Sequence, residues 1–173
     1  MRNRFKAALL SIVLNGAVAS AEPALIGSKG RYIITEYIDS SPQHAWEILT
    51  DFKLHQKLAP DIAQVQIWHH GNGILHITNT YKALYTFGLP IKARLAIKKT
   101  SPKGFSYSLV QSDHLKSLKG EWTILPLTSG VKLQHKIWIE PIMPVGLRPF
   151  YYQKQEESLK RWMETLKKEI ESQ

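Results

Sequence analysis

The feature that most limits how this chain can fold is an alternation of apolar and polar side chains that recurs along residues 31–139. In residues 131–139, for example, every odd position except His135 is apolar, and the even positions are polar apart from Trp138. This period is typical of an antiparallel sheet with one covered face and one face in water. Strands are therefore expected over residues 31–38, 62–70, 74–81, 91–99, 105–109, 121–124 and 131–139, with turns at 102–104 and 128–130.

The segments on either side of Gly71–Gly73 form a hairpin whose register the sequence favours. A two-residue Asn-Gly turn would pair apolar residues with threonines and mix the two faces. A three-residue loop places Ile67 opposite Ile77 and His69 opposite Leu75, which separates the faces more cleanly. This register is preferred, and it turns the following side chains inward: Val65, Ile67, His69, Leu75, Ile77, Asn79 and Tyr81.

Helix signals occur after the first strand and at the end of the chain. Ser41 and Pro42 fit the N-cap and first position of a helix with apolar residues at helical spacing: Ala45, Trp46, Ile48, Leu49 and Phe52. Asp51 is expected to cap a second helix that ends at Leu58, and turn or capping roles are also expected for Asp39 and Asp61. A long helix is expected over residues 149–171, with the apolar stripe Tyr152, Leu159, Trp162, Met163, Leu166 and Ile170.

The first 21 residues have the layout of a secretory signal peptide. A basic start is followed by the apolar run 7–18, and Ala19-Ser20-Ala21 fits a small-x-small cleavage site. The run is shorter than the roughly 20 residues that span a bilayer; a frayed N-terminal helix is the alternative. We expect residues 1–21 to be removed, residues 22–173 to form one ligand-binding domain, and the protein to be periplasmic or secreted.

The composition argues against several kinds of chemistry. The chain has no Cys, so disulfides, thiolate catalysis and cysteine-ligated metals are excluded. The net charge of +9 suits anionic surfaces such as lipid headgroups. No aromatic-basic motif indicates nucleic-acid binding. His69 and His70 point to opposite faces of their strand, no His pair has metal-ligand spacing, and no nucleophile elbow or phosphate loop occurs. We therefore expect neither a metal site nor a cofactor.

A group of polar residues is expected on the inward face of the sheet: His69, Asn79, Tyr81, Tyr107 and His135. They would lie beside the apolar residues Val65, Ile67, Leu95, Leu133 and Ile137. A ligand cavity is mostly apolar with a few placed polar groups, and the combined set fits that description. The alternative is that each polar residue is satisfied in the core by a neighbour or a buried water.

Two tryptophans, Trp68 and Trp138, are expected on the outward face. They lie near Arg94, Lys132 and Lys136, a combination that suits a membrane interface or a protein partner. Strong curvature of the sheet, or a different register, would place them elsewhere.

The order of elements and several motifs resemble the START-like (SRPBCC) superfamily, which includes the birch pollen allergen fold and polyketide cyclases. The motifs are Ser41-Pro42, Ala45-Trp46-Glu47-Ile48-Leu49, Asp51-Phe52, residues 58–62, and Gly120-Glu121-Trp122 with Pro126. They are most similar to its coenzyme Q-binding, cyclase-like branch. The resemblance implies an α+β helix-grip fold, in which a curved antiparallel sheet wraps a long C-terminal helix and encloses a cavity. Trp46 and Phe52 would then pack at the end of the sheet that the short helices close. For Trp46, contact with a ligand is the alternative.

Three functions remain open at this point. The first is an exported carrier of a hydrophobic small molecule such as a lipid, quinone or isoprenoid. The second is a cyclase- or aromatase-like enzyme, in which His69, Tyr107 or His135 would act on the substrate. The third is an interaction module with a filled core and a partner surface around Trp68 and Trp138. The signal peptide departs from mitochondrial and cytoplasmic members of the family, which argues against their quinone-carrier and ribosome-associated roles.

Overall fold

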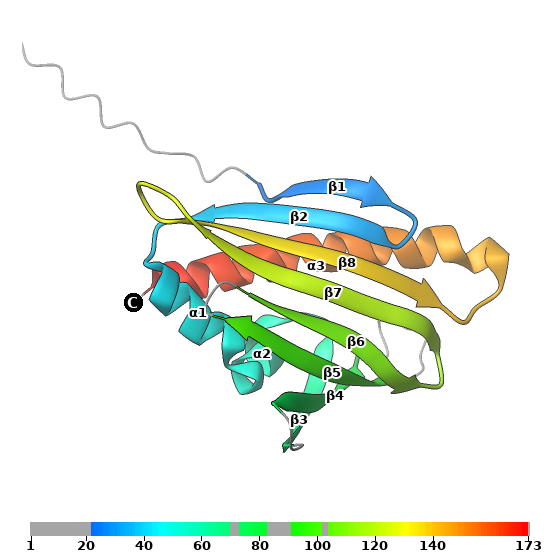
Figure 1. Ribbon diagram of the computed structural model, residues 1–173. Coiled ribbons are helices and arrows are strands. Elements are labelled where there is room, and N and C mark those ends of the chain that lie inside the picture. The colour runs from blue at the N-terminus through cyan, green and yellow to red at the C-terminus, as the bar shows by residue number, and fades with distance from the viewer. Residues whose placement is uncertain (1–21, 70–72, 83–90, 102–103, 173) are drawn as a thin grey trace, which may run out of the picture.

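The computed structural model describes residues 22–69, 73–82, 91–101 and 104–172 (Figure 1). Its strands are β1 (Ala24–Ser28), β2 (Arg31–Ile38), β3 (Ile62–His69), β4 (Ile74–Tyr81), β5 (Lys92–Ser101), β6 (Gly104–Ser112), β7 (Leu115–Pro126) and β8 (Val131–Pro141). Its helices are α1 (Pro42–Thr50), α2 (Phe52–Leu58) and α3 (Arg148–Glu171), and a 3₁₀ turn at Val145–Leu147 precedes α3.

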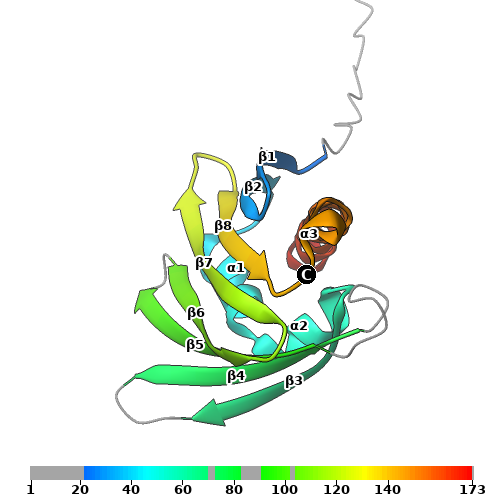
Figure 2. The same cartoon turned by 90° about the vertical axis from the view of Figure 1, so that its right-hand side faces the viewer.

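The described strands form one antiparallel sheet of eight in the order β1-β2-β8-β7-β6-β5-β4-β3. Figure 2 looks along α3 and shows the sheet curving round one side of this helix. Helices α1 and α2 lie at the end of the sheet where α3 finishes (Figure 1). The core consists of the inward side chains of the sheet and the buried face of α3. This is the expected α+β helix-grip architecture.

The alternation in the sequence places the correct side chains inside. In β8 the odd-numbered residues from Val131 to Ile139, His135 included, are buried, whereas Lys136 is exposed. The predicted hairpin register is also confirmed, since Ile67 pairs with Ile77 and His69 pairs with Leu75. Residues 70–72 of its loop, and with them His70, lie outside the described residues.

Both short helices begin at the caps expected from the sequence. The Ser41 hydroxyl accepts a hydrogen bond from the backbone N–H of His44 (3.1 Å), and Pro42 occupies the first turn. The Asp51 carboxylate accepts from the N–H groups of Lys53 and Leu54, both at 3.1 Å. Asp39 lies in a bend and Asp61 in a turn, in line with the turn positions expected for them, and no helix among the described residues begins at either.

Three parts of the fold differ from the prediction. Strand β1 was not expected; four of its five residues are exposed, so an edge strand of this kind leaves no alternation to detect. Strand β7 is much longer than residues 121–124 and begins at Leu115. On α3 the buried aromatic is Tyr151, and Tyr152 is half-buried instead. Tyr152 packs against the β1–β2 turn, where Gly30 leaves room for its ring.

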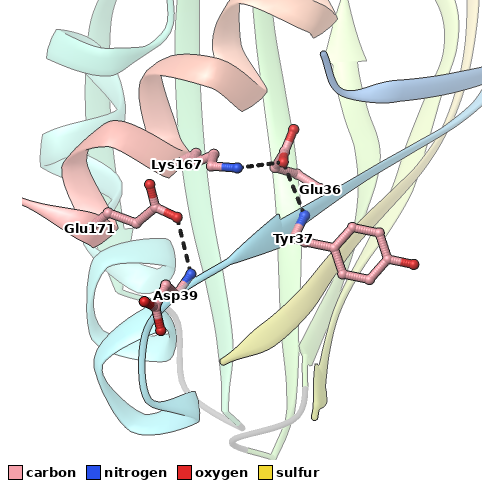
Figure 3. A network of polar contacts seen from close by, with 5 residues as sticks. All are labelled: Glu36, Tyr37, Asp39, Lys167 and Glu171. Carbon is pink, nitrogen blue, oxygen red and sulfur yellow. Dashed lines mark hydrogen bonds and ion pairs between the residues drawn. The ribbon is translucent and has the colours of Figure 1, made fainter. Parts of the chain in front are cut away.

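The C-terminal end of α3 is tied to β2 by two polar contacts, drawn in Figure 3. Lys167 donates to the carboxylate of Glu36 at 2.8 Å, and both side chains are largely buried, 17% and 5% exposed. Glu36 also accepts from the backbone N–H of Tyr37 at 3.1 Å. Beside this pair, the Glu171 carboxylate accepts from the backbone N–H of Asp39 at 3.0 Å. These contacts fix the helix across the sheet at the end where α1 begins.

Removing Lys167 while keeping Glu36 is expected to destabilise the fold strongly. Lys167→Met leaves a carboxylate without its partner in a site that is only 5% exposed, which costs about 3 kcal/mol. Urea denaturation measures this loss. Lys154→Met on the same helix is the matched control, because its pair with Glu157 is 36% and 42% exposed and is worth less than about 1 kcal/mol.

Combining Glu36→Gln with Lys167→Met should recover most of the stability, because no charge then remains buried. A double variant that is no more stable than Lys167→Met would show that the loss comes from packing of the lysine side chain and not from an unpaired carboxylate.

Candidate functional site

A cavity of about 90 Å³ lies between the concave face of the sheet and α3. Its apolar wall comes from helices and strands that are far apart in the sequence: Phe52, Ile62, Ile77, Ile91, Leu95, Ile97, Phe105, Leu115, Leu118, Trp122, Ile137, Ile139, Leu159 and Trp162. The polar residues that line it are His55, Asp61, Asn79, Tyr81, Tyr107, Tyr151, Gln155 and Ser158. A mostly apolar wall with a few polar groups is the usual composition of a small-molecule site.

One polar group in the cavity contains Asp61, which lies between α2 and β3. The buried hydroxyl of Ser158, on α3, donates a hydrogen bond to its carboxylate. Burial raises the pKa of Asp61. Hydrogen bonds from its own backbone N–H and from Ser158, together with the cations of Lys82 and Arg161, offset only part of this rise. The balance therefore shifts the carboxyl group towards its neutral form, which can both donate and accept hydrogen bonds.

Asn79 and Tyr81 lie on the same face of β4 and also line the cavity. The side-chain amide of Asn79 hydrogen-bonds the Tyr81 hydroxyl. Its other atom, the carbonyl Oδ1, is buried and has no partner among the described residues. Burial raises the pKa of Tyr81 and of the neighbouring Tyr151, so both phenols stay protonated at neutral pH.

A second polar group joins β6 to β8 across β7. The Tyr107 hydroxyl and Nε2 of His135 share a hydrogen bond of 2.8 Å. Tyr107 reaches across β7 at its pairing partner Gly120, where a Cβ atom would lie 2.4 Å from the phenol oxygen. Glycine is therefore required at position 120 for this contact. The imidazole of His135 stacks on Trp122 with ring centroids 4.0 Å apart.

Two buried histidines are held neutral beside the cavity. His55 donates from Nε2 to the backbone carbonyl of Leu49 at 2.9 Å, and its ring meets Phe52 and Trp162 edge-on. Burial lowers the pKa of His55 to about 4 and that of His135 to about 3. Neither ring therefore carries positive charge at neutral pH.

The ten cavity residues named from the sequence divide into three groups. Asn79, Tyr81, Tyr107, Leu95 and Ile137 line the cavity. Val65, Ile67, Leu133 and His135 do not; the first two are half-buried on β3, which packs against α2, and the other two are fully buried in β8. For His69 only the backbone pairing is described, and its side chain lies outside the described residues.

Sequence reasoning missed Asp61, His55 and Ser158. Asp61 follows Pro60 in a turn, and such a position says nothing about where the carboxylate points. His55 and Ser158 are polar residues on helices, and only their spacing from apolar neighbours hints that they face inward. Ser158 lies seven residues after Tyr151 and next to Leu159, which places it on the buried stripe of α3.

Trp68 and Trp138 both lie outside the cavity lining. Trp68 is 53% exposed on the edge strand β3. Trp138 is half-buried on β8 between two cations: the Arg31 guanidinium lies 4.5 Å from its ring centroid and the Lys119 ammonium 4.0 Å. Trp138 thus already has cation–π partners within the chain. Within the described residues, no helix is long and apolar enough to cross a membrane. Among the same residues, no three potential ligands converge as a metal site.

Known structures share this architecture at low sequence identity. A START superfamily protein from Mycobacterium smegmatis is 19% identical, with a TM-score of 0.68 over 81% of this chain and 96% of its own. The Zhui aromatase/cyclase from Streptomyces sp. R1128 is 14% identical, with a TM-score of 0.65 over 82% of this chain and 93% of its own. The protein Ara h 8.0201 is 12% identical, with a TM-score of 0.59 over 83% and 98%.

The chain has the START-like helix-grip fold. Identities this low establish the architecture and leave the chemistry to be argued from the site. No protein-family model matches the sequence, and no curated protein matches it either. The structures that share the fold include, besides these three, the di-domain aromatase/cyclase StfQ from the steffimycin biosynthetic pathway.

The buried histidines predict that the protein loses stability in mild acid. Their folded pKa values of about 4 and about 3 lie below the roughly 6.5 of an unfolded histidine. The unfolded chain therefore binds more protons between these values, and the free energy of unfolding falls as the pH drops below about 6.5. Each histidine contributes up to about 1.4 kcal/mol per pH unit. Urea denaturation at several pH values measures the slope.

His135→Gln keeps a hydrogen-bonding side chain near Tyr107 but cannot titrate, so it is expected to flatten this slope. Burial raises the pKa of Asp61, so this residue makes the free energy of unfolding rise as the pH falls. It is present in both the parent and the variant, and its contribution cancels when their slopes are compared. Slopes that are the same in the parent, in His135→Gln and in His55→Gln would show that the two rings are not held neutral by the fold.

Proposed function

We propose that this protein is a non-catalytic binding or carrier protein for a hydrophobic small molecule held between the sheet and α3. The observation that carries the proposal is the cavity, whose wall is mostly apolar and whose polar groups come from α2, β4, β6 and α3. The START-like fold of the chain supports it, because this fold encloses ligand sites in other proteins. Lipids, quinones and isoprenoids are the ligand classes that the sequence resemblance suggests.

The volume of the cavity favours a compact ligand within these classes. At about 90 Å³ it is smaller than the roughly 300–1,000 Å³ of pockets that hold drug-sized molecules. A short isoprenoid or a single small ring system fits this volume better than a diacyl lipid or a long-chain quinone, which would require α3 to move away from the sheet.

A cyclase-like activity that uses Tyr107 or His135, as expected from the sequence, is less well supported. A general acid or base works best with a pKa near the operating pH. Burial lowers the pKa of His135 to about 3 and raises that of Tyr107 well above its ordinary value, so both move away from neutrality. Their mutual hydrogen bond and the stacking on Trp122 instead form a structural contact.

The cavity also disfavours an interaction module with a filled core. Trp68 nevertheless supports contact with a membrane surface or a protein as a second property of the outer face, since it is 53% exposed on an edge strand. Trp138 supports such a contact less well, because Arg31 and Lys119 already cover its ring.

Filling the cavity is expected to abolish ligand binding. Leu118 lines the cavity and is 3% exposed, whereas Leu125 lies on the same strand, is 38% exposed and does not line it. Leu118→Trp should weaken binding of toluene, a neutral single-ring probe whose binding isothermal calorimetry measures, at least about tenfold, and Leu125→Trp should leave it unchanged. Circular dichroism confirms that both variants fold. Equal binding by both variants, or no binding by the parent protein, would refute the cavity as a ligand site.

We further propose that the protein is exported and works in the periplasm or outside the cell, on the basis of the basic start, the apolar run and Ala19-Ser20-Ala21. N-terminal sequencing of the protein recovered from the exported fraction is expected to begin at Glu22. Recovery of a chain that begins at Met1 and remains in the cytoplasm would overturn this assignment without affecting the cavity.

A further inference from the structure

We infer that the cavity selects an uncharged, apolar molecule with a hydroxyl group, and that this hydroxyl donates a hydrogen bond to Oδ1 of Asn79. The inference rests on the proposed binding function and narrows its ligand class. It is drawn from the charges and the hydrogen-bonding groups that the cavity presents.

The cavity offers no positive charge to an acidic ligand. Among the described residues that line it, none is Lys or Arg. The one histidine in the lining, His55, is neutral, since its Nε2–H is committed to the carbonyl of Leu49 and its ring is buried against Phe52 and Trp162. Lys82 and Arg161 lower the pKa of Asp61 but do not line the cavity, so a carboxylate or phosphate that enters would lose its hydration without contacting a cation, which is unfavourable. Asp61 adds repulsion whenever it is ionised.

Asn79 supplies an acceptor that the protein itself leaves unused. Its side chain is only 6% exposed and lines the cavity. Its amide group is held by the Tyr81 hydroxyl on the same face of β4, and this contact leaves Oδ1 without a partner among the described residues. A buried carbonyl oxygen without a donor is destabilising, so a ligand that brings an O–H group to this point gains affinity by satisfying it.

The carboxyl group of Asp61 belongs to the same polar region. It lines the cavity together with Asn79, Tyr81 and Tyr151, and its charge bears on both tyrosines. Ser158 donates to it, and its own backbone N–H also donates to it, so the carboxyl group is anchored to α3 and to its own turn. A hydroxyl is both donor and acceptor and can therefore bond Asn79 and a protonated Asp61 together. An ether or a carboxylate cannot do both.

Three probes of matched size test the inference. Octan-1-ol has a hydroxyl, its isomer 1-methoxyheptane has only an acceptor oxygen, and octanoate is negatively charged at neutral pH. Trp122 and Trp162 line the cavity, so quenching of intrinsic tryptophan fluorescence reports binding, and isothermal calorimetry checks it. We expect octan-1-ol to bind about fivefold more tightly than the ether and more than about tenfold more tightly than octanoate.

The variant Asn79→Leu removes the acceptor and keeps a side chain of similar size. It is expected to bind octan-1-ol and 1-methoxyheptane equally, with little change for the ether. Gln66→Leu, which removes a side-chain amide from an exposed position on β3, is the matched control and should keep the preference for the alcohol. Thermal denaturation confirms that both variants are folded.

The outcomes separate this inference from the proposed function. Binding of octanoate as tight as that of octan-1-ol would overturn the selection against charge. An alcohol preference that survives in Asn79→Leu would overturn the role of this residue. In both cases the hydrophobic-ligand function would stand. If none of the three probes, nor toluene, binds the parent protein, the binding function itself is wrong.

Discussion

The rest of the structure depends on the burial of one apolar sheet face against a single helix. A sheet of eight strands has far more inward surface than one helix can cover while the sheet stays flat. The sheet therefore curves round α3, and α1 with α2 covers the end that the helix leaves open (Figures 1 and 2). Side chains from opposite parts of such a curved sheet converge on the helix without filling all the space between them. The cavity is thus a consequence of how the fold buries its core.

The polar groups inside this core fall into two kinds. Tyr107 and His135 bond each other, and Gly120 makes the contact possible by leaving room for the phenol. That arrangement pairs the Tyr107 hydroxyl with Nε2 of His135 and stabilises the wall. Asn79 is different, because its Oδ1 is an acceptor without a donor among the described residues and belongs to a residue that lines the cavity. Other buried atoms also have no partner among the described residues, namely Nδ1 of His135 in the core and the donor Nε1 of Trp162 in the lining, but within the described lining Oδ1 of Asn79 is the unpaired acceptor. A ligand hydroxyl at this point would satisfy it.

The proteins of similar structure show that this fold does not by itself determine a protein's chemistry. A START superfamily protein and an aromatase/cyclase share the fold with this chain at 19% and 14% identity. A shared fold does not fix the chemistry, which depends on the side chains that each protein places at its site. Here the described lining combines an uncharged histidine, phenols, two amides, a serine and the buried carboxyl group of Asp61 with a long apolar wall and no Lys or Arg. A lining without Lys or Arg is suited to holding a neutral molecule.

The sequence by itself determined the elements, the inward face and the caps, because each depends on near neighbours. Period-two alternation identified β2 to β6 and β8 and the β3–β4 register, and the Ser41 and Asp51 caps followed from local hydrogen bonds to the next turn. The sequence also indicated that Asn79, Tyr81 and Tyr107 face the inside of the sheet, since they are polar residues at otherwise apolar positions.

Tertiary structure alone decided the contacts between residues that are far apart in the sequence. The ion pair of Glu36 with Lys167, the crossing of Tyr107 over Gly120 and the meeting of Asp61 with Ser158 join residues that only sheet curvature brings together. Curvature also separated Val65 and Ile67 from the cavity, because a strand's alternation fixes which face a side chain is on and not how deep it lies.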